Sequence, residues 1–530
     1  MIDLLNNLVV YSANAFPDHI AVRHKADELT YEHLATEIEH AACGFKTMGL
    51  ERDERIAIYL PKRPETVTSF FAAGRANGVF VPINPLLKPA QVEYILRDCN
   101  VRMLVTSKDR YLHIREALDG CHDLHTIVLV DEETDQQPKS HKLNMVSWQQ
   151  LLSASDVPPV QQRIDTDMAA IFYTSGSTGK PKGVVLSHRN MVLGAKSVAA
   201  YLNNTQDDRL LAVLPLSFDY GFSQLSTALY KGASVTLMDY LLPRDVLKTI
   251  AKDGITGLAG VPPLWNQLKH LEWPAEAAQS IRYITNSGGA MPKTTLNHLR
   301  NALPNSQVYL MYGLTEAFRS TYLPPGELDK RPDSMGKAIP NAEVMVVRED
   351  GTPCRPGEPG ELIHKGSLVA MGYWNSPDTT AERFKPAPGQ DNALTIPEVS
   401  VWSGDTVKTD ADGFLYFVGR KDDMIKTSGY RVSSTEVEEV VYATQQVGEV
   451  VALGIPHPTL EQGILIVATP NPMGHHDNKI DEKSILTHCK KELPNFMVPL
   501  AIKTHDALPR NPNGKIDRKL LSSMYQDIFS

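Results

Sequence analysis

Hydrophobic side chains recur every three to four residues between residues 31 and 48, which is the spacing of one face of an α-helix. The positions on this face are Leu34, Ile38, Ala41, Ala42, Phe45 and Met48. Thr30 stands before the stretch, where a hydroxyl can cap a helix, and Gly49 follows it, where glycine commonly ends one. The pattern therefore predicts one amphipathic helix.

Short hydrophobic runs, typical of buried strands, alternate with helical stretches along the following part of the chain. These runs cover residues 55–60, 79–83, 102–106, 126–130, 210–214 and 235–238, and a helical pattern covers residues 64–77. A strand, helix, strand order favours parallel α/β architecture. Residues 131–141, rich in acidic residues, Gln and Ser, are predicted to form a surface loop.

The pattern changes after about residue 340, where short β elements at residues 343–347 and 360–363 are separated by Gly/Pro turns. A final segment has the order helix (434–444), strand (447–453), strand (464–469), helix (481–493). The fold class is therefore α/β, with a large amino-terminal body of layered α/β subdomains plus a β-rich portion. A small α+β domain follows it, and we divide the chain into residues 1–421 and 422–530.

Composition and charge exclude several classes of protein. The formal net charge is -9, and the sequence contains no long run of Lys and Arg that could bind a nucleic-acid backbone. No nucleic-acid partner is therefore expected. No stretch approaches 18 uninterrupted apolar residues and no basic, apolar leader opens the chain, so we expect no membrane segment and a cytoplasmic location. The five cysteines lie far apart without metal-type spacing and are interpreted as reduced thiols.

Residues 173–183 (YTSGSTGKPKG) form the most informative stretch, and they follow an apolar run at residues 168–172. Glycines, hydroxyl side chains and lysines at this density make a flexible, cationic loop that can face a polyphosphate. The loop is not a Walker A motif, because Pro181 follows Gly179 and Lys180 where that motif has Ser or Thr.

This loop resembles the phosphate-binding signature of the adenylate-forming superfamily, which includes acyl-CoA synthetases, amino-acid adenylation domains and luciferases. The resemblance continues in the family's order over essentially the whole chain, through residues 312–316 (YGLTE), 403–405 (SGD), 419–426 (GRKDDMIK), 428–431 (SGYR) and 509–515 (PRNPNGK). It implies ATP and Mg²⁺ as cofactors. It also implies a mobile carboxy-terminal domain that rotates about a hinge at Asp422.

The resemblance implies the nucleotide site residue by residue. The expected nucleotide-binding residues are Thr174, Ser175, Gly176, Ser177, Thr178, Gly179, Lys180, Lys182, Ser287, Gly288, Gly289, Met311, Tyr312, Gly313, Thr315, Asp405, Arg420 and Lys515. Asp405 is chemically suited to accept hydrogen bonds from both ribose hydroxyls. Glu316 is a hard carboxylate that suits Mg²⁺, which prefers one or two carboxylates together with phosphate oxygens and water.

Four residues receive catalytic roles from the resemblance, namely Lys515, Glu316, Thr315 and Thr174. Lys515 is expected to bridge the substrate carboxylate and the α-phosphate, and Thr315 to bind that phosphate. The attacking carboxylate is ionised at pH 7, so the first half-reaction needs no general base. No Ser/His/Asp triad or nucleophilic Cys competes, so no covalent enzyme intermediate is expected.

The stretch at residues 214–221 (LPLSFDYG) addresses the identity of the carboxylate. Fatty and aryl acyl-CoA ligases usually carry an aromatic-His pair here, whereas amino-acid adenylation domains carry Phe-Asp, with the aspartate on the substrate's α-ammonium group. This chain has Phe218 and Asp219. An anionic side chain in the acid pocket favours a substrate with an ammonium group. A helix cap or a solvent-facing acid is the alternative interpretation of Asp219.

Motif spacing arranges the rest of the acid pocket around Asp219. The expected substrate-binding residues are Asp219, Tyr220, Ser223, Gly260, Thr285, Ser287, Met311, Arg319 and Ser320. Tyr220 and Met311 would narrow the pocket, and Arg319 has no evident partner in an apolar substrate.

The chain looks most similar to stand-alone prolyl adenylating enzymes, which load L-proline onto the phosphopantetheine thiol of a carrier protein. An acyl-CoA ligase that acts on a small polar acid is an alternative, with coenzyme A as the acceptor. A non-enzymatic nucleotide-binding protein is a third possibility, against which the presence of Lys515, Glu316 and Asp405 argues.

Overall fold

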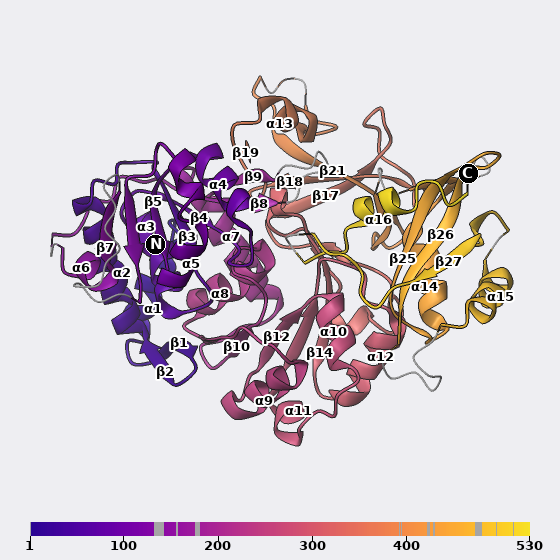
Figure 1. Cartoon of the computed structure of the whole chain (residues 1–530), viewed down its shortest axis with the longest axis horizontal. Coiled ribbons are helices and arrows are strands. Elements are labelled where there is room, and N and C mark those ends of the chain that lie inside the picture. Colours follow the sequence, from indigo (N-terminus) through magenta and orange to yellow (C-terminus); the bar gives the residue numbers. More distant parts are fainter. Residues whose placement is uncertain are drawn as a thin grey trace.

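Four β-sheets organise the part of the chain that the computed structural model describes. That part comprises residues 2–131, 143–154, 157–174, 181–391, 393, 395–420, 424–427, 430–471, 480–493, 495–511 and 514–529. Figure 1 shows the amino-terminal and carboxy-terminal segments on opposite sides of the molecule. The surface loop predicted at residues 131–141 lies outside the described residues except for Asp131.

The first sheet has the strand order β19-β9-β8-β4-β3-β5-β6-β7. Its strands are β3 (Arg55–Tyr59), β4 (Val79–Pro82), β5 (Val101–Thr106), β6 (Thr126–Leu129), β7 (Asn144–Ser147), β8 (Met168–Thr174), β9 (Lys182–Ser187) and β19 (Gly372–Tyr373). Strands β8, β4, β3, β5, β6 and β7 run parallel, whereas β9 pairs with β8 in the antiparallel sense. The predicted strands at residues 55–60, 79–83, 102–106 and 126–130 are therefore confirmed.

The helices of this region are α1 (Asn7–Ala15), α2 (Tyr31–Thr47), α3 (Pro64–Arg75), α4 (Pro89–Asp98), α5 (Lys108–Ile114), α6 (Trp148–Leu152) and the 3-10 helix η1 (Ala117–Gly120). Helix α2 is the amphipathic helix that the sequence predicts. The Thr30 hydroxyl accepts a hydrogen bond from the His33 backbone N–H, so it caps the helix as expected.

The second sheet has the order β16-β15-β14-β13-β12-β10-β11-β1-β2. Its strands are β1 (Ile20–His24), β2 (Asp27–Thr30), β10 (Arg209–Ala212), β11 (Ser234–Leu237), β12 (Gly257–Gly260), β13 (Tyr283–Asn286), β14 (Gln307–Tyr312), β15 (Thr321–Tyr322) and β16 (Lys337–Ala338). The associated helices are α7 (His188–Tyr201), α8 (Asp219–Lys231), α9 (Pro243–Asp253), α10 (Pro262–Leu268), α11 (Ala275–Ser280), α12 (Lys293–Ala302), η2 (Thr315–Ala317) and η3 (Pro325–Glu327).

Helix α8 joins the two sheets through one aromatic side chain. Phe222 of α8 packs against Phe70 of α3, Phe80 of β4 and Phe172 of β8 with ring centroids 5.4 to 5.8 Å apart. Each of these rings is almost entirely buried. Burial of large aromatic side chains is strongly stabilising, so this cluster fixes α8, and with it the residues at its amino terminus.

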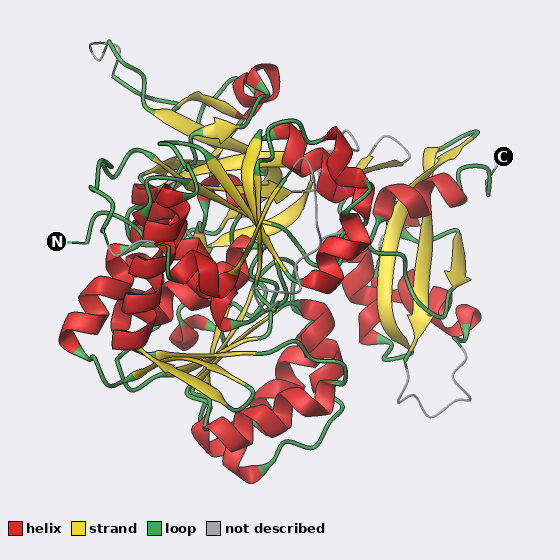
Figure 2. Ribbon diagram, turned by 60° about the vertical axis from the view of Figure 1, so that its left-hand side comes forward, coloured by secondary structure: helices red, strands yellow, loops and turns green. Residues whose placement is uncertain are grey.

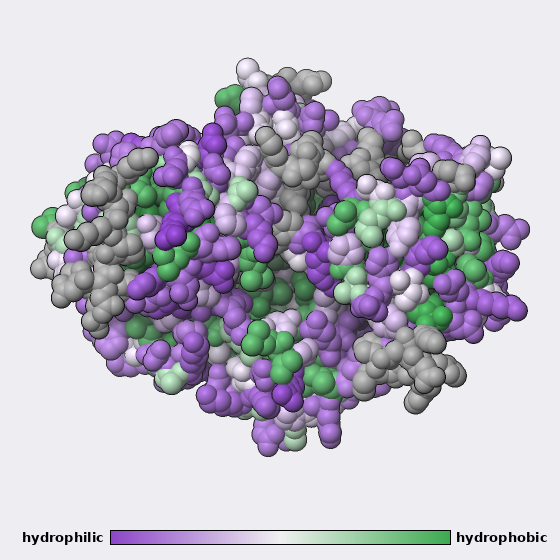
Figure 3. Space-filling view, in the orientation of Figure 1, coloured by the Kyte–Doolittle hydropathy of each residue, from purple (hydrophilic) through white to green (hydrophobic). Residues whose placement is uncertain are grey.

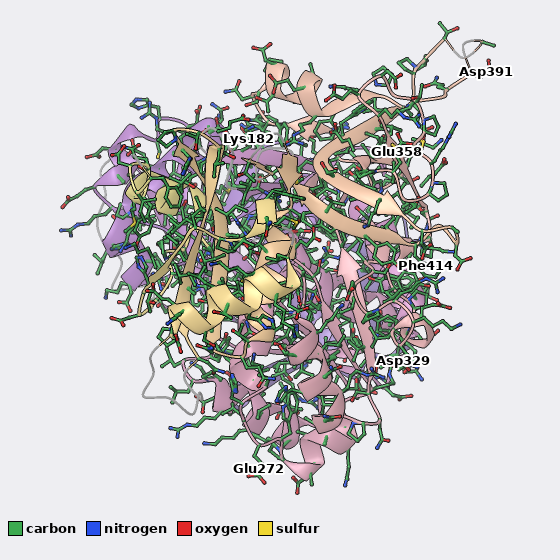
Figure 4. The ribbon with its side chains drawn as sticks, turned by 90° about the vertical axis from the view of Figure 1, so that its right-hand side faces the viewer. Lys182, Glu272, Asp329, Glu358, Asp391 and Phe414 are labelled. Atoms are coloured by element: carbon green, nitrogen blue, oxygen red, sulfur yellow. The ribbon has the colours of Figure 1, made fainter. Side chains whose placement is uncertain are left out.

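The β-rich portion is a sheet of five strands, β17 (Ala342–Val347), β18 (Gly360–Gly366), β20 (Phe384–Pro386), β21 (Val399–Thr409) and β22 (Leu415–Arg420), with helix α13 (Pro377–Arg383). All of its described pairings are antiparallel. Asp391, between β20 and β21, lies at the end of a hairpin that projects from the body (Figure 4).

The carboxy-terminal sheet stands apart from the sheets of the body (Figure 2). Its elements are β23 (Ile425–Thr427), β24 (Tyr430–Val432), α14 (Ser434–Ala443), β25 (Val447–His457), β26 (Glu461–Pro470), α15 (Glu482–Glu492), η4 (Asn495–Met497), β27 (Ala501–Thr504) and α16 (Arg518–Met524). Alternate residues of β25 and β26 face two separate hydrophobic clusters, one with α14 and α15 and one with α16. This period of two is the one that a sheet covered on both faces requires.

The surface in Figure 3 is mostly hydrophilic, with hydrophobic side chains in separate groups. Among the described residues, no helix combines the length and the apolar character that crossing a membrane requires.

Candidate active site

The predicted site residues converge on one edge of the second sheet. Strands β10, β12, β13 and β14 run parallel, so their carboxyl ends meet at the same edge. Asp219 and Tyr220 follow β10, Gly260 ends β12, Thr285 lies in β13, and Met311 and Tyr312 end β14. Ligands of open parallel sheets bind beyond the carboxyl ends of the strands, so this edge is where a site is expected.

Asp219 is the first residue of α8 and is only 3% exposed, so it is neither the helix cap nor a solvent-facing acid. Its Oδ1 accepts a hydrogen bond from the Thr315 hydroxyl at 3.2 Å, and its Oδ2 forms an ion pair with Arg319 Nη1 at 3.0 Å. A helix amino terminus also favours negative charge. These contacts stabilise the ionised carboxylate deep in the protein.

Arg319 therefore has a partner, contrary to the impression that its position gives in the sequence. That partner is a side chain of the protein, Asp219, and the side chains of both residues are almost entirely buried. The guanidinium carbon also lies 4.7 Å from the ring centroid of Tyr220, a cation–π contact. A buried charge without a partner is costly, and the pair removes that cost.

The remaining acid-pocket residues divide into connected and unconnected side chains. The Tyr220 hydroxyl and the Thr285 hydroxyl are 2.6 Å apart, which extends the network from Asp219 and Arg319 to β13. Met311 Sδ lies 3.1 Å from the Tyr201 hydroxyl. The hydroxyl of Ser223, one turn after Asp219 on α8, is buried and has no hydrogen-bond partner among the described residues.

Ser320 contacts a residue that the sequence did not single out. Its hydroxyl is 2.8 Å from Nδ1 of His364 on β18, and both residues are fully buried. Burial lowers the pKa of His364 to about 4, so the ring is neutral at pH 7. This contact connects the acid pocket to the β-rich sheet.

The nucleotide end of the site is formed where β14 meets β21 and β22. The Tyr312 hydroxyl donates to Asp405 Oδ2 at 2.5 Å, and Arg420 Nε lies 3.4 Å from Asp405 Oδ1. Burial raises the pKa of Asp405, while Arg420 and the Tyr312 hydrogen bond act in the opposite direction. The structure thus brings together the three residues that were expected around adenine and ribose.

Gly404 positions Asp405. It has φ +70°, which L-residues rarely adopt, and a Cβ at this position would lie 2.2 Å from Nη1 of Arg383. Arg383 of α13 donates to the Trp402 carbonyl and counteracts the rise in the Asp405 pKa. Gly404 is therefore favoured by the turn, and a side chain at this position would displace the Arg383 guanidinium.

Residues 287–289, which the sequence predicts beside adenine, form a turn directly after β13. Ser287 is buried, whereas Gly288 and Gly289 are exposed, and Gly288 has φ +77°. The Asn286 amide donates to the Gly289 carbonyl at 2.9 Å and closes this turn.

At the phosphate end, Glu316 and Lys182 are connected through a tyrosine. The Tyr373 hydroxyl donates to Glu316 Oε1 at 2.6 Å, and Lys182 Nζ lies 5.5 Å from the centroid of the Tyr373 ring. Burial, followed by the Glu316 charge, raises the pKa of Tyr373, so its hydroxyl keeps its proton and remains a donor. Figure 4 labels Lys182 at the start of β9.

The donor set of this end suits a hydrated magnesium ion held with phosphate oxygens. Glu316 offers one oriented carboxylate, and the described residues contain no cluster of three or more His, Cys, Asp or Glu that could bind a metal by themselves. Mg²⁺ is commonly bound by one or two carboxylates, substrate phosphates and water rather than by an all-protein cage.

Most of the glycine-rich loop predicted to bind phosphate lies outside the described residues. Thr174 ends β8 and is partly exposed, whereas Ser175, Gly176, Ser177, Thr178, Gly179 and Lys180 lie outside the described residues. The proposed hinge residue Asp422 also lies outside them. The sheet partners change across this region, because β22 pairs with β21 of the body and β23 pairs with β24 and β26.

Lys515 reaches the site from the carboxy-terminal region. Its Nζ lies 6.0 Å from the centroid of the Phe218 ring, directly before Asp219. Although the residue as a whole is exposed, the protein around its ammonium lowers its pKa by desolvation, and Arg420 lowers it further. The charges of Asp219, Asp405 and Glu316 act in the opposite direction and raise its pKa.

The loop that carries Lys515 is held by Arg510. Arg510 forms an ion pair with Glu449 at 2.5 Å and donates to the Gly514 carbonyl at 2.7 Å. The Lys515 backbone N–H donates to the Asn511 side chain, and the Asn511 backbone N–H donates to the Lys515 carbonyl. This tight turn presents the lysine at its end.

Three residues of the site were missed in the sequence: Tyr373, Arg383 and His364. Each comes from the β-rich portion or from β19, far along the chain from the partner that it contacts. Tyr373 belongs to the Gly-Tyr-Trp run at residues 372–374, which is the only local signal for it in the sequence around it. Cys99, Cys121 and Cys489 are buried, and burial raises the pKa of each thiol to about 11 or 12, which argues against a cysteine nucleophile.

Comparison with known proteins agrees with this fold and this site. Residues 9–374 match the AMP-binding enzyme family, and residues 436–515 match the AMP-binding enzyme C-terminal domain. A site formed at the carboxyl edge of the sheet by Tyr312, Asp405, Glu316 and Lys515 is one suited to a nucleotide and a carboxylate. Because the match covers more than half of the chain, this protein belongs to the AMP-binding enzyme family.

Similar proteins fall into two groups. The chain is 29% identical over 516 residues to gramicidin S synthase 2 of Brevibacillus brevis, with 95% of the chain covered but only 11% of that relative. It is 28% identical to feruloyl-CoA synthase of Amycolatopsis sp, with 97% of both proteins covered. It is 26% identical to long-chain-fatty-acid–CoA ligase of Bacillus subtilis, with 98% of the chain and 94% of the relative covered.

Solved structures share the fold over nearly the whole chain. ATP-bound MatB from Rhodopseudomonas palustris has a TM-score of 0.85 at 24% identity and covers 99% of this chain and 100% of its own. The anthranilate CoA ligase AuaEII in complex with anthranoyl-AMP has a TM-score of 0.87 at 24% identity and covers 98% and 97%.

Proposed function

We propose that this protein activates an amino acid, with L-proline the first candidate, and transfers it to a thiol. ATP and the amino acid give an aminoacyl-AMP and pyrophosphate, and the phosphopantetheine thiol of a carrier protein then displaces AMP. The buried Asp219 carboxylate carries this proposal, because a carboxylate at the expected acid site, held in an ion pair with Arg319, suits a substrate that brings an ammonium group.

The Asp219 carboxylate has hydrogen-bonding capacity left for that ammonium. A carboxylate accepts hydrogen bonds at about four lone-pair sites. Thr315 occupies one site on Oδ1 and Arg319 one site on Oδ2. The remaining sites are available to a substrate cation, whose carboxylate would then point toward Lys515 beside Phe218.

The chemistry of the first half-reaction is electrostatic. Lys515 neutralises negative charge as the ionised substrate carboxylate attacks the α-phosphorus, and the Thr315 hydroxyl is a donor for the α-phosphate. Glu316, oriented by Tyr373, would hold Mg²⁺, which neutralises the departing pyrophosphate. Tyr312, Asp405 and Arg420 hold the nucleoside.

An acyl-CoA ligase for a small polar acid is the second candidate. Two observations favour it: the relatives covered over nearly their whole length are named as CoA ligases or synthases, and Arg319 places a cation beside the acid pocket. An acid with a second anionic group would then meet Arg319 rather than Asp219.

Substrate-dependent exchange of pyrophosphate into ATP separates the two candidates. We expect exchange with L-proline and little with cyclopentanecarboxylate, which has the same ring without the nitrogen. The Asp219→Asn variant should lose most of this discrimination. Exchange with fatty, aryl or dicarboxylic acids, and with no amino acid, would contradict the proposal. Acceptor identity is tested separately, by comparing transfer to a phosphopantetheinylated carrier protein with transfer to coenzyme A.

A further inference from the structure

The turn that precedes Arg319 is strained. Phe318, the residue after η2, has φ +53°, a value that a bulky L-residue rarely adopts. Its side chain is fully buried. Backbone strain of this kind persists only where the surrounding structure holds it in place, and it is concentrated at functional sites.

A glycine in helix α7 makes the space that holds Phe318. A Cβ at Gly194 would lie 2.3 Å from Cδ1 and 2.4 Å from Cε1 of the Phe318 ring, so the ring occupies the position of a side chain. Glycine in a helix interior costs stability relative to alanine. The stability that Gly194 costs the helix is offset by the packing of the Phe318 ring in the space that the glycine leaves.

The strained turn directs Arg319 to Asp219. Nη1 of Arg319 donates both to the Phe318 carbonyl and to Asp219 Oδ2, each at 3.0 Å. Nη2 lies 3.4 Å from the Asp219 carbonyl, and the Tyr220 ring lies against the guanidinium. The guanidinium is thus held by four contacts, and each Asp219 carboxylate oxygen accepts one hydrogen bond from the part of the chain that the structure describes.

We propose that Arg319 is a positioning residue that holds the Asp219 carboxylate in the orientation that binds the substrate ammonium. The turn at Phe318, whose ring packs against Gly194, directs Arg319 toward Asp219. The proposal rests on the proposed function, in which Asp219 accepts the ammonium. Arg319 itself does not contact the substrate in this arrangement. It sets the orientation of the carboxylate and compensates its charge in the empty pocket.

Three variants test the role of Arg319. Arg319→Met keeps much of the side-chain volume without charge, Arg319→Lys keeps the charge without the fork of donors, and Asp219→Asn combined with Arg319→Met removes both buried charges. The readouts are KM and kcat for L-proline in pyrophosphate exchange, KM for ATP, and the ratio of kcat/KM for proline to that for cyclopentanecarboxylate.

We expect Arg319→Met to raise KM for proline roughly ten- to a hundredfold, the usual effect of losing hydrogen bonds to a charged group, with a smaller change in kcat. The proline-to-cyclopentanecarboxylate ratio should fall by a similar factor, and KM for ATP should stay within about threefold of wild type. Arg319→Lys should recover part of the ratio, because the charge is kept. A merely structural role would not change this ratio.

Gly194→Ala tests the seat of Phe318, with Gly74→Ala as the matched control. Both glycines are buried in helices, α7 and α3, but a Cβ at Gly74 would meet nothing closer than 3.4 Å. We expect Gly194→Ala to lower the proline-to-cyclopentanecarboxylate ratio in the same direction as Arg319→Met. Gly74→Ala should leave this ratio unchanged.

The outcomes separate the two proposals. If wild-type protein supports exchange with no amino acid, the proposed function fails. If wild-type protein discriminates for proline and Arg319→Met discriminates equally well, the positioning role fails while the proposed function stands. If Arg319→Met loses exchange activity with an anionic substrate and keeps its activity with proline, Arg319 contacts the substrate directly. That result would also overturn the positioning role. If Arg319→Met does not fold, the comparison rests on Arg319→Lys, whose proline-to-cyclopentanecarboxylate ratio should lie below that of wild type; an unchanged ratio would overturn the positioning role.

Discussion

At the scale of single residues, Lys515 has the most clearly separable role. The Lys515→Ala variant should lower aminoacyl-AMP formation about 10²- to 10³-fold, the usual effect of removing one charge-stabilising group. Transfer from supplied aminoacyl-AMP to the thiol should be retained, because Lys515 is proposed to act only on the first half-reaction. Single-turnover assays of each half-reaction check this, and an equal loss in both would contradict it.

The same lysine should set the alkaline limit of the first half-reaction. Desolvation and Arg420 lower the pKa of Lys515, and only the charged form neutralises the transition state. Activity is therefore expected to fall as the pH rises through a value below the ordinary 10.5 of a lysine. Lys515→Arg, whose guanidinium stays charged, should be slower but should lack this alkaline limb.

Tyr373 is a residue whose removal should affect magnesium rather than the acid substrate. Tyr373→Phe deletes the donor to Glu316 Oε1 and keeps the ring beside Lys182. Loss of a partner that orients a metal ligand commonly costs 10- to 100-fold in metal affinity, so the Mg²⁺ concentration for half-maximal exchange should rise about that much. The control is Tyr59→Phe, a substitution in β3 that removes a hydrogen bond to the Leu87 carbonyl. It should not change the Mg²⁺ concentration for half-maximal exchange.

At the scale of elements, most of the sequence predictions hold because they depend on local patterns. Helix α2 with its Thr30 cap, the parallel strands β3 to β6, and the order α14, β25, β26, α15 all match their predicted ranges within a few residues. Each has a clear period or a terminal signal. The antiparallel β9, beside the parallel β8, was not predicted, because strand direction depends on the turn that joins them.

The site was less predictable than the elements around it. Asp219, Tyr312 and Asp405 were identified by motif, but the Asp219–Arg319 pair and the Tyr373–Glu316 hydrogen bond join residues 100 and 57 positions apart in the chain. No periodic pattern encodes such a contact. It arises only when α8, η2 and β19, which come from different parts of the chain, are brought together by the core.

The turn in β21 allows a prediction about an element. Gly404→Ala and Gly413→Ala both place an L-residue at positive φ, +70° and +80°, so each should lose about 1 kcal/mol of unfolding free energy. A Cβ at Gly404 also meets Arg383, whereas one at Gly413 meets nothing within 4 Å. Only Gly404→Ala should therefore raise KM for ATP. Denaturant unfolding and ATP titrations check the two parts, and equal ATP KM values would contradict the second.

At the scale of the whole molecule, α14 of the carboxy-terminal region faces a charged part of the body. Burial, together with the charges of Asp333 and Glu438 and against that of Lys293, raises the pKa of Glu439 to about 7. Lys293 and Asp333 form an ion pair 2.8 Å long. A carboxyl that rotates into water would regain an ordinary pKa near 4.3.

This arrangement predicts that pH biases the orientation of the two parts. Below about pH 4.3, protonated Glu439 favours the orientation seen here to the full extent, and this preference is lost between about pH 4.3 and 7 because the carboxyl in water ionises first. Adenylate formation relative to thiol transfer should therefore decline over this range and level off above about pH 7, and Glu439→Gln should remove the decline. Glu436→Gln, an exposed position on the same helix, is the control. A ratio that does not change with pH in wild-type protein would contradict the prediction.

The Thr315 hydroxyl links the two halves of the pocket through a single proton. It donates to Asp219 in this structure, yet it has only one O–H, so it cannot also donate to a phosphate oxygen. If a bound nucleotide accepts the Thr315 hydrogen bond, Asp219 Oδ1 loses that donor. A substrate ammonium can then donate to Asp219 in its place. The two ligands are then thermodynamically linked, each raising the affinity for the other by the same factor. Isothermal titration of the amino acid with and without a non-hydrolysable ATP analogue measures that factor. Thr315→Val should reduce the factor toward one, so that each substrate would bind with the same affinity whether or not the other is present.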